Sequence, residues 1–171
     1  MAQDCVTKTY FAYGSNLWLD QMLRRCPTSP YTSVARLPNY RWLICERGYA
    51  NIVRSPGDEV WGMLYNLTPP DEASLDGYEG VPQAYTKEMI PVELTNGTSM
   101  DALVYIDYNH QIDGTVKEEY IQRMSCAIKD GVGKGIPQSY VQKYMLKPLG
   151  LGADIFRPGS SSGSDKCVYP N

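Results

Sequence analysis

Residues that could do chemistry begin with a short turn near the N-terminus, Gly14-Ser15-Asn16. This turn lies between an apolar, β-prone run at 7–13 and a segment with helical spacing at 17–26. The first N–H groups of a helix are unpaired, and together with the helix dipole they favour an anion. The turn therefore predicts a pocket for a carboxylate or phosphate. The alternative is a plain strand–helix turn in which Ser15 or Asn16 caps the helix.

The second candidate is Glu79, which is flanked by Tyr78 and Gly80 and followed by Val81-Pro82. Desolvation raises the pKa of a carboxyl group in tight, apolar surroundings, which would suit Glu79 to general acid–base catalysis near neutral pH. The alternative is an exposed turn residue, because most Glu side chains are solvated. The neighbouring acids fit turn or helix-end roles and are interpreted as structural: Asp58, Glu59, Asp71, Glu72 and Asp76.

The composition limits the remaining chemistry, because the chain has one His, His110, against fourteen Tyr. A single His excludes a multi-His metal site and leaves little material for a Ser-His-Asp or Cys-His triad. Ser15 therefore lacks a base that would make it a nucleophile. Tyr85 and Tyr120 could donate hydrogen bonds into a pocket, although core filling is the alternative for any of the tyrosines.

Charge and cysteine usage bear on location and partners. The net charge of −3 and the lack of a basic run give no electrostatic case for nucleic acid or an anionic membrane. No secretory signal or stretch of transmembrane length is recognised. The five cysteines are scattered without a Cys-x-x-Cys pair, so we expect reduced thiols in a cytoplasmic protein.

Hydrophobic periodicity predicts a mixed, barrel-like α+β domain at 1–150 and a Gly/Ser/Pro-rich tail at 151–171, flexible over its last dozen residues. Hairpin turns are expected at 55–58 and at Asn96-Gly97. Gly62 inside a strand marks a bulge, a bend or a close backbone approach. The expected strands are 7–13, two pieces within 34–45, 49–54, 59–67, 85–94 and 99–108, and the expected helices are 17–26, 69–76, 116–128 and 137–146.

Several motifs, taken together and in order, resemble the γ-glutamylcyclotransferase family. The resemblance runs from Tyr10 to Tyr144 and rests on Tyr10–Leu17, Val34–Leu37, Ser55–Gly62, Ser74–Asp76 and Glu79–Val81. It implies a small β-barrel flanked by helices and a cytoplasmic enzyme that uses neither metal nor cofactor. Such enzymes convert γ-glutamyl amino acids to 5-oxoproline and the free amino acid.

Carried over residue by residue, the resemblance implies a general acid/base at Glu79. The implied substrate-binding residues are Tyr13, Gly14, Ser15, Asn16, Leu17, Tyr85 and Tyr120. The implied partner is a small-molecule γ-glutamyl substrate, without nucleic acid or membrane, and a homodimer is left open. We expect the amides of the 13–17 loop and the Glu79 carboxylate to face one cavity.

Two other functions stay open. Some relatives, fungal ones among them, resemble enzymes that act on glutathione-derived conjugates in specialised metabolism. A non-catalytic binding module that kept the pocket is the other. Pro82-Gln83-Ala84 beside Glu79 and the tail after Gly150 depart from the family pattern, and both could reshape the pocket and change which γ-glutamyl compound fits it.

Overall fold

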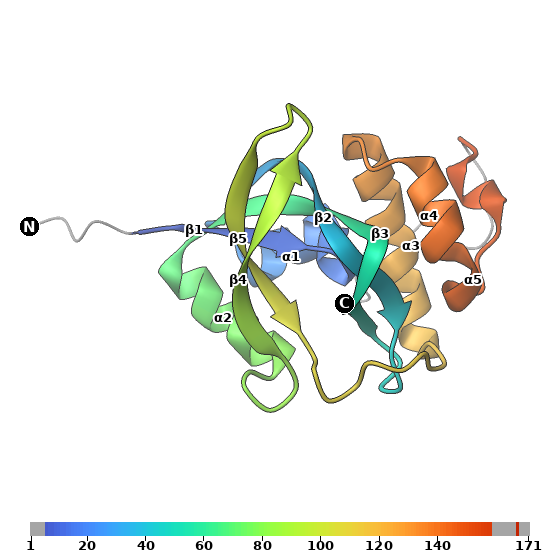
Figure 1. The fold of residues 1–171 in the computed structure, drawn as a ribbon, viewed down its shortest axis with the longest axis horizontal. Helices are drawn as coiled ribbons and strands as arrows, with labels where there is room; N and C mark the ends of the chain where they lie inside the picture. Colours follow the sequence, from blue (N-terminus) through green and yellow to red (C-terminus); the bar gives the residue numbers. More distant parts are fainter. Residues whose placement is uncertain (1–5, 159–166, 168–171) are drawn as a thin grey trace, which may run out of the picture.

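A closed five-stranded β-barrel forms the centre of the computed structural model, which describes residues 6–158 and Cys167 (Figure 1). Neighbouring strands follow the order β1-β3-β2-β4-β5, and a parallel contact between β5 and β1 closes an otherwise antiparallel sheet. The predicted mixed barrel is confirmed. The strands are β1 (Lys8–Ala12), β2 (Tyr31–Ile44), β3 (Ala50–Leu67), β4 (Thr86–Leu94) and β5 (Ser99–Ile106).

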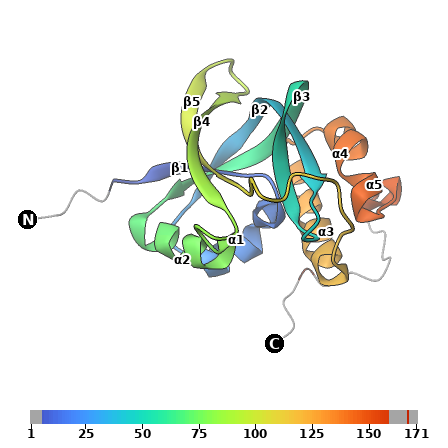
Figure 2. The same cartoon turned by 60° about the horizontal axis from the view of Figure 1, so that its bottom comes forward.

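Helices flank the barrel in two groups, as Figures 1 and 2 both show. The C-terminal group lies on one side and comprises α3 (Glu118–Lys134), α4 (Gln138–Tyr144) and α5 (Leu146–Leu149). On another side lie α1 (Leu19–Arg25) and α2 (Pro69–Glu79). Two short 3₁₀ helices complete the described elements: η1 (Ser15–Leu17) and η2 (Ala153–Phe156).

The turn predicted at 55–58 is wrong, because β3 continues through it. Both halves of β3 pair with β2, with Arg54 opposite Tyr40 and Glu59 opposite Pro38. The intervening residues form an irregularity facing Asn39, whose side chain accepts a hydrogen bond from the Gly57 N–H at 3.2 Å. Pro-Gly signals a local reversal, but here the long β2–β3 pairing overrides that signal. The β2–β3 hairpin turns instead at residues 45–49, whereas the predicted Asn96-Gly97 turn between β4 and β5 is confirmed.

Two helices run further than predicted, and one of them places Glu79. Gly77 does not end α2; Gly80 does, in the left-handed conformation at φ 64°. Likewise α3 continues through its internal glycines to a left-handed Gly135. A glycine ends a helix by adopting this conformation just after it, and composition alone does not say which glycine will do so. Glu79 is consequently the last residue of α2.

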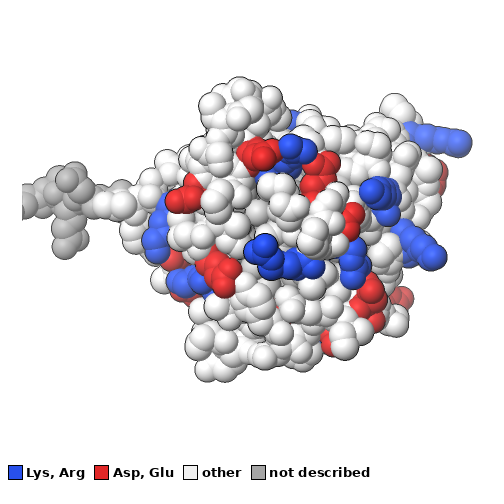
Figure 3. Space-filling model, viewed as in Figure 1, with Lys and Arg blue, Asp and Glu red and all other residues white. Residues whose placement is uncertain are grey.

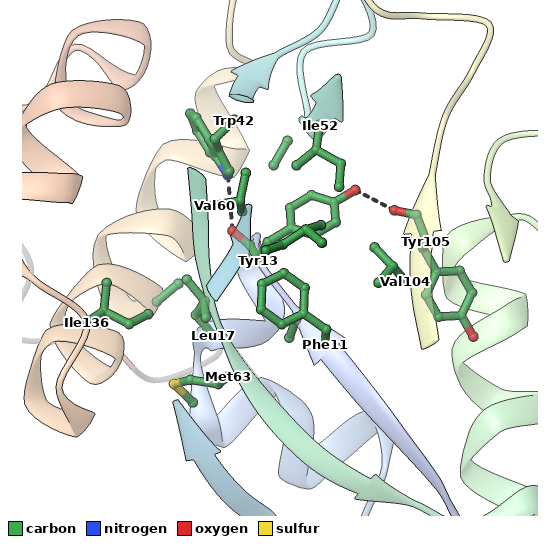
Figure 4. Close-up of a cluster of buried hydrophobic side chains, with 14 of the residues drawn as sticks. Phe11, Tyr13, Leu17, Trp42, Ile52, Val60, Met63, Val104, Tyr105 and Ile136 are labelled. Atoms are coloured by element: carbon green, nitrogen blue, oxygen red, sulfur yellow. Dashed lines mark hydrogen bonds between the residues drawn. The ribbon is translucent and has the colours of Figure 1, made fainter. Parts of the chain in front are cut away.

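The core fills the barrel and continues beneath the C-terminal helices (Figure 4). Two hydrogen bonds fix Tyr13 within it: the Trp42 Nε1–H donates to the Tyr13 carbonyl at 3.0 Å, and the Tyr13 hydroxyl donates to the Tyr105 carbonyl at 2.6 Å. The end of β1 is thereby tied to both β2 and β5. This anchors the turn that follows directly, Gly14-Ser15-Asn16.

The expectation of reduced thiols is wrong for one pair, since Cys126 of α3 forms a disulfide with Cys167. Their Cα atoms lie 5.6 Å apart, across 41 residues of sequence. A pairing over that separation leaves no signature in cysteine spacing. Cys26 and Cys45 are free and buried. Of the predicted tail, 151–158 and Cys167 are described, with Ile155 and Phe156 packed on the core; the rest of the tail, including its predicted flexibility, lies outside the described residues.

Asp71 joins the start of α2 to the segment after α1. Its buried Oδ2 accepts hydrogen bonds from the Thr28 N–H at 2.9 Å, the Thr28 hydroxyl at 2.7 Å and the Ser29 hydroxyl at 2.7 Å. Burial opposes the charged form, but these hydrogen bonds outweigh it and hold the pKa of Asp71 below its ordinary value.

We expect Asp71→Ala to lower the free energy of unfolding by about 2–4 kcal/mol at pH 7, because buried donors lose a charged acceptor. A lowered carboxyl pKa stabilises the fold at neutral pH, and this contribution disappears as the pH falls through the folded-state pKa. Urea unfolding at pH 7 and pH 3 should therefore show a smaller difference between variant and wild type at pH 3. The control is Asp101→Ala, at an exposed position on β5, which should change stability by less than about 0.5 kcal/mol. Equal losses in the two variants would contradict this role.

Candidate active site

A cavity of about 280 Å³ opens where β1, η1, the end of α2, the β2–β3 turn and α3 meet. It collects residues that lie far apart in the sequence. Of the predicted site residues, the cavity is lined by Tyr13, Gly14, Ser15, Asn16, Glu79, Tyr85 and Tyr120.

Leu17 is the predicted site residue that the structure places elsewhere. Its side chain is 1% exposed and packs in the core close to Gly131 of α3 (Figure 4). Its N–H donates to the Gly14 carbonyl at 3.0 Å, so that group is occupied within the 3₁₀ turn. Leu17 thus supports the loop from the core side, and neither its side chain nor its N–H is presented to the cavity.

Hydrogen bonds hold the Gly14-Ser15-Asn16 turn in place. The Ser15 N–H donates to the Tyr120 hydroxyl at 3.2 Å. The buried Asn16 side chain donates to the Tyr10 hydroxyl at 3.0 Å and accepts from Gln21 Nε2 at 2.8 Å. Neither Ser15 nor Asn16 caps α1, which starts after Trp18. Among the described residues, the N–H groups of Gly14 and Asn16 have no hydrogen-bond partner, as an anion-binding turn requires.

Glu79 presents an unpaired carboxyl group to the cavity. Within the described part of the chain, no hydrogen-bond or ion-pair partner reaches its carboxylate, although the residue is largely enclosed. Desolvation raises its pKa from the ordinary 4.5 to about 7, against the opposing charges of Arg25, Arg47 and Arg123. An acid in this state exchanges protons near neutral pH, which an exposed turn residue would not do.

The cavity tyrosines fall into two groups by the direction of their hydrogen bonds. Tyr13 and Tyr85 use their hydroxyl protons on backbone carbonyls, those of Tyr105 and Ala50, at 2.6 and 3.0 Å. Tyr10 and Tyr120 accept hydrogen bonds from Asn16 and Ser15, so their own hydroxyl protons remain for a ligand. Tyr120 was a predicted site residue, whereas Tyr10 was not, although it is the first residue of the Tyr10–Leu17 motif.

Three arginines in the cavity wall were also missed: Arg25 at the end of α1, Arg47 in the β2–β3 turn and Arg123 on α3. They come from separate elements, and no spacing in the sequence links them. Arg25 lies over the Tyr78 ring at 4.3 Å and donates to Asn16 Oδ1 at 3.3 Å. The wall therefore combines three cations with one acid whose pKa is near neutral, and it suits a ligand that carries carboxylates.

Outside the cavity, the described residues give little support for a catalytic His, a metal site or a membrane-spanning helix. His110 binds Asp107, with 2.8 Å between Nδ1 and Oδ2, and does not line the cavity. No group of three or more His, Cys, Asp or Glu among residues 6–158 and Cys167 is arranged to hold a metal ion. None of the helices described has the length and hydrophobicity needed to cross a bilayer. On the face in Figure 3, basic and acidic side chains are mixed in small groups.

Comparison with known proteins adds independent support for the family. The family model described as "Gamma-glutamyl cyclotransferase, AIG2-like" matches residues 10–123. A Mus musculus protein named gamma-glutamylcyclotransferase is 32% identical over 152 residues, which are 82% of this chain and 79% of the relative. The Homo sapiens protein of that name is 29% identical over 148 residues, covering 78% of this chain and 75% of its own length.

Structural comparison agrees. A solved structure named gamma-glutamyl cyclotransferase superposes with a TM-score of 0.72 at 25% identity, covering 87% of this chain and 95% of the other. A crystal structure of an uncharacterized Homo sapiens protein gives the same TM-score at 26% identity, with 88% and 96% covered. The barrel, the cavity and the sequence match lead to one conclusion: this chain belongs to the gamma-glutamyl cyclotransferase, AIG2-like family.

Proposed function

We propose that this enzyme converts a γ-glutamyl compound to 5-oxoproline and a free amine, with Glu79 as general acid and base. The carrying observation is the Glu79 carboxyl group, which faces the cavity without a partner among the described residues and has a pKa of about 7. The names of the relatives support the same reaction.

The substrate supplies its own nucleophile. Its α-amino nitrogen attacks the γ-carbonyl carbon, a C–N bond forms to close the five-membered ring, and the original amide C–N bond breaks to release the amine. The protein must fold the substrate into this geometry, which is worth up to about 7–11 kcal/mol in well-oriented intramolecular reactions. This explains how a site without a Ser, Cys or His nucleophile can catalyse the reaction.

Proton transfer is the part assigned to Glu79. The substrate ammonium has a pKa of about 8, close to the value of about 7 for Glu79. Ionised Glu79 takes one proton from the ammonium and later gives it to the leaving nitrogen. The ring nitrogen loses a second proton as the amide C–N bond breaks, and the released amine takes up this proton, so the carboxyl group ends the cycle as it began. Acid–base catalysis of this kind contributes about 10²–10⁴-fold.

The surrounding donors are proposed to bind the γ-glutamyl head. The N–H groups of Gly14 and Asn16 and the hydroxyl protons of Tyr10 and Tyr120 are available at the cavity. They would hold the α-carboxylate or stabilise the oxyanion on the γ-carbonyl. Tyr13, Ser15 and Tyr85 are proposed to shape this wall, since their hydrogen bonds are made within the protein. We also predict that the reaction is of the lyase type, needs no metal and belongs to glutathione metabolism. The protein is predicted to be cytoplasmic.

The test is a panel of γ-glutamyl dipeptides, glutathione and glutathione conjugates, assayed for 5-oxoproline. We expect release from at least one γ-glutamyl dipeptide, because the cavity offers a base and several donors for carboxylates. Release from conjugates alone would instead favour the enzyme of specialised metabolism. No 5-oxoproline from any compound, together with measurable binding, would leave the non-catalytic binding module as the better explanation.

A further inference from the structure

Arg47 reaches the cavity from the β2–β3 turn and is fixed there by a buried acid. Its Nη1 donates to Oδ2 of Asp107 at 3.2 Å, and the Asp107 side chain is fully buried. Asp107 is fixed in turn by Asn51: the Asp107 N–H donates to Asn51 Oδ1 at 3.1 Å, and Asn51 Nδ2 donates to the Asp107 carbonyl at 2.8 Å. A cation positioned in advance loses less conformational entropy when it binds a ligand.

The free side of the Arg47 guanidinium suits a carboxylate. Among the described residues its hydrogen bond is made through Nη1, which leaves Nε and Nη2 for a bidentate contact. The guanidinium lies beside two cavity tyrosines, with its carbon 5.6 Å from the Tyr85 ring centre and 5.8 Å from that of Tyr49. These rings limit its freedom and its hydration, so an anion that reaches it meets a partly desolvated cation.

Arg25 and Arg47 serve different parts of the cavity. Arg25 is hydrogen-bonded to Asn16, within the turn proposed to hold the γ-glutamyl head. Among the described residues, no hydrogen bond or ion pair joins Arg47 to the turn, and its guanidinium lies beside Tyr49 and Tyr85. Arg123, the third cation of the wall, pairs with Glu119 on α3 at 3.1 Å. The γ-glutamyl head carries one carboxylate, so Arg47 in another part of the wall matches a second carboxylate on the rest of the substrate.

We propose that Arg47 is a specificity-determining residue that binds a carboxylate on the leaving amine. The enzyme then favours γ-glutamyl amino acids and γ-glutamyl peptides with a carboxylate within reach over neutral γ-glutamyl amines. This inference rests on the proposed cyclotransferase function. A neutral leaving group would keep the partly desolvated Arg47 N–H groups without an acceptor, which is costly for charged donors.

The experiment compares γ-glutamyl-alanine with γ-glutamyl-alanine amide, which differ only in the carboxylate of the leaving group. We expect the wild type to prefer the acid about 10- to 100-fold in kcat/KM, the range for one hydrogen bond to a charged group. Arg47→Gln should bring the ratio near one by lowering activity on the acid alone, and Arg47→Lys should keep part of the preference. The matched control is Arg41→Gln. Arg41 lies on β2, pairs with Asp113 and does not line the cavity, so this variant should keep the wild-type ratio.

The outcomes separate this inference from the proposed function. A wild type without preference, or an unchanged ratio in Arg47→Gln, overturns the role of Arg47 while the cyclotransferase activity stands. If neither compound yields 5-oxoproline, the proposed function fails. The affinities of the two compounds, measured by calorimetry, then show whether Arg47 binds the carboxylate. Tighter binding of the acid by wild type but not by Arg47→Gln supports the subsite, and equal binding overturns it. Melting temperatures show whether each variant is folded.

Discussion

Glu79→Gln is expected to lower kcat for 5-oxoproline release by about 10²–10⁴-fold, the usual contribution of a positioned acid–base group. Glutamine has nearly the same shape but neither accepts nor returns a proton. The control is Glu118→Gln, at an exposed position in the first turn of α3, which should retain wild-type activity. Full activity in Glu79→Gln would rule out the proposed mechanism.

The pH dependence of wild-type activity provides a second measurement on the same residue. Ionised Glu79 is the form that accepts the ammonium proton, and its pKa is about 7. We therefore expect kcat/KM to rise with pH, to reach half of its plateau near pH 7 and to level off above that pH. The residual activity of Glu79→Gln should lack this limb, because the titrating group is gone.

Stability should change in the opposite sense to activity. The pKa of Glu79 is higher in the folded state, about 7, than its ordinary 4.5, so the folded protein binds more protons between these values. The free energy of unfolding then falls as the pH rises through this window, by up to roughly 3 kcal/mol, and the penalty is complete above pH 7. Glu79→Gln removes that penalty, so at pH 8 its melting temperature should equal or exceed that of the wild type. Loss of activity with a much lower melting temperature would instead indicate damage to the fold.

The sequence revealed the barrel because its signals are local. Alternating and continuous apolar runs mark strands such as β5, and Asn96-Gly97 marks the turn before it. Where a local signal competed with long-range pairing, the pairing prevailed, as at 55–58, where β3 continues along β2. The same limit applied to the end of α2, since Gly77 and Gly80 look alike in sequence and only the packing decides which one adopts the left-handed conformation.

The candidate site was predictable where it is carried by short motifs and not where it is assembled by the fold. The Gly14-Ser15-Asn16 turn and Glu79 are each conspicuous in sequence, and the structure brings them to one cavity. Arg47 and Asp107 become meaningful only when the β2–β3 turn meets the end of β5, a contact that no spacing encodes. Leu17 shows the converse: adjacency to the turn did not make it part of the cavity wall.

Gly62→Ala is expected to lower the free energy of unfolding by about 3 kcal/mol, through overpacking between two strands. Gly62 lies on β3, where the neighbouring strand β1 approaches closely. A close backbone approach was one of the three predicted explanations for a glycine inside this strand. A Cβ atom built there would lie 2.4 Å from the Ala12 carbonyl oxygen and 2.6 Å from Phe11 Cε2. The Ala12 carbonyl belongs to the barrel ladder, where Ala12 pairs with Met63, so relief requires β1 itself to move.

The same displacement should reach the active site, because Gly14 follows β1 by two residues and the Tyr13 anchor lies between them. We expect kcat/KM to fall at least about tenfold even at temperatures where Gly62→Ala is fully folded, since small misplacements of positioning groups are costly in intramolecular reactions. Chemical denaturation and 5-oxoproline release measure the two effects separately. The control is Gly133→Ala on α3, where an added Cβ meets no atom within 4 Å and the helix should gain up to about 1 kcal/mol. If Gly62→Ala matched wild type in both measurements, the close approach of β1 and β3 would not be what positions the turn.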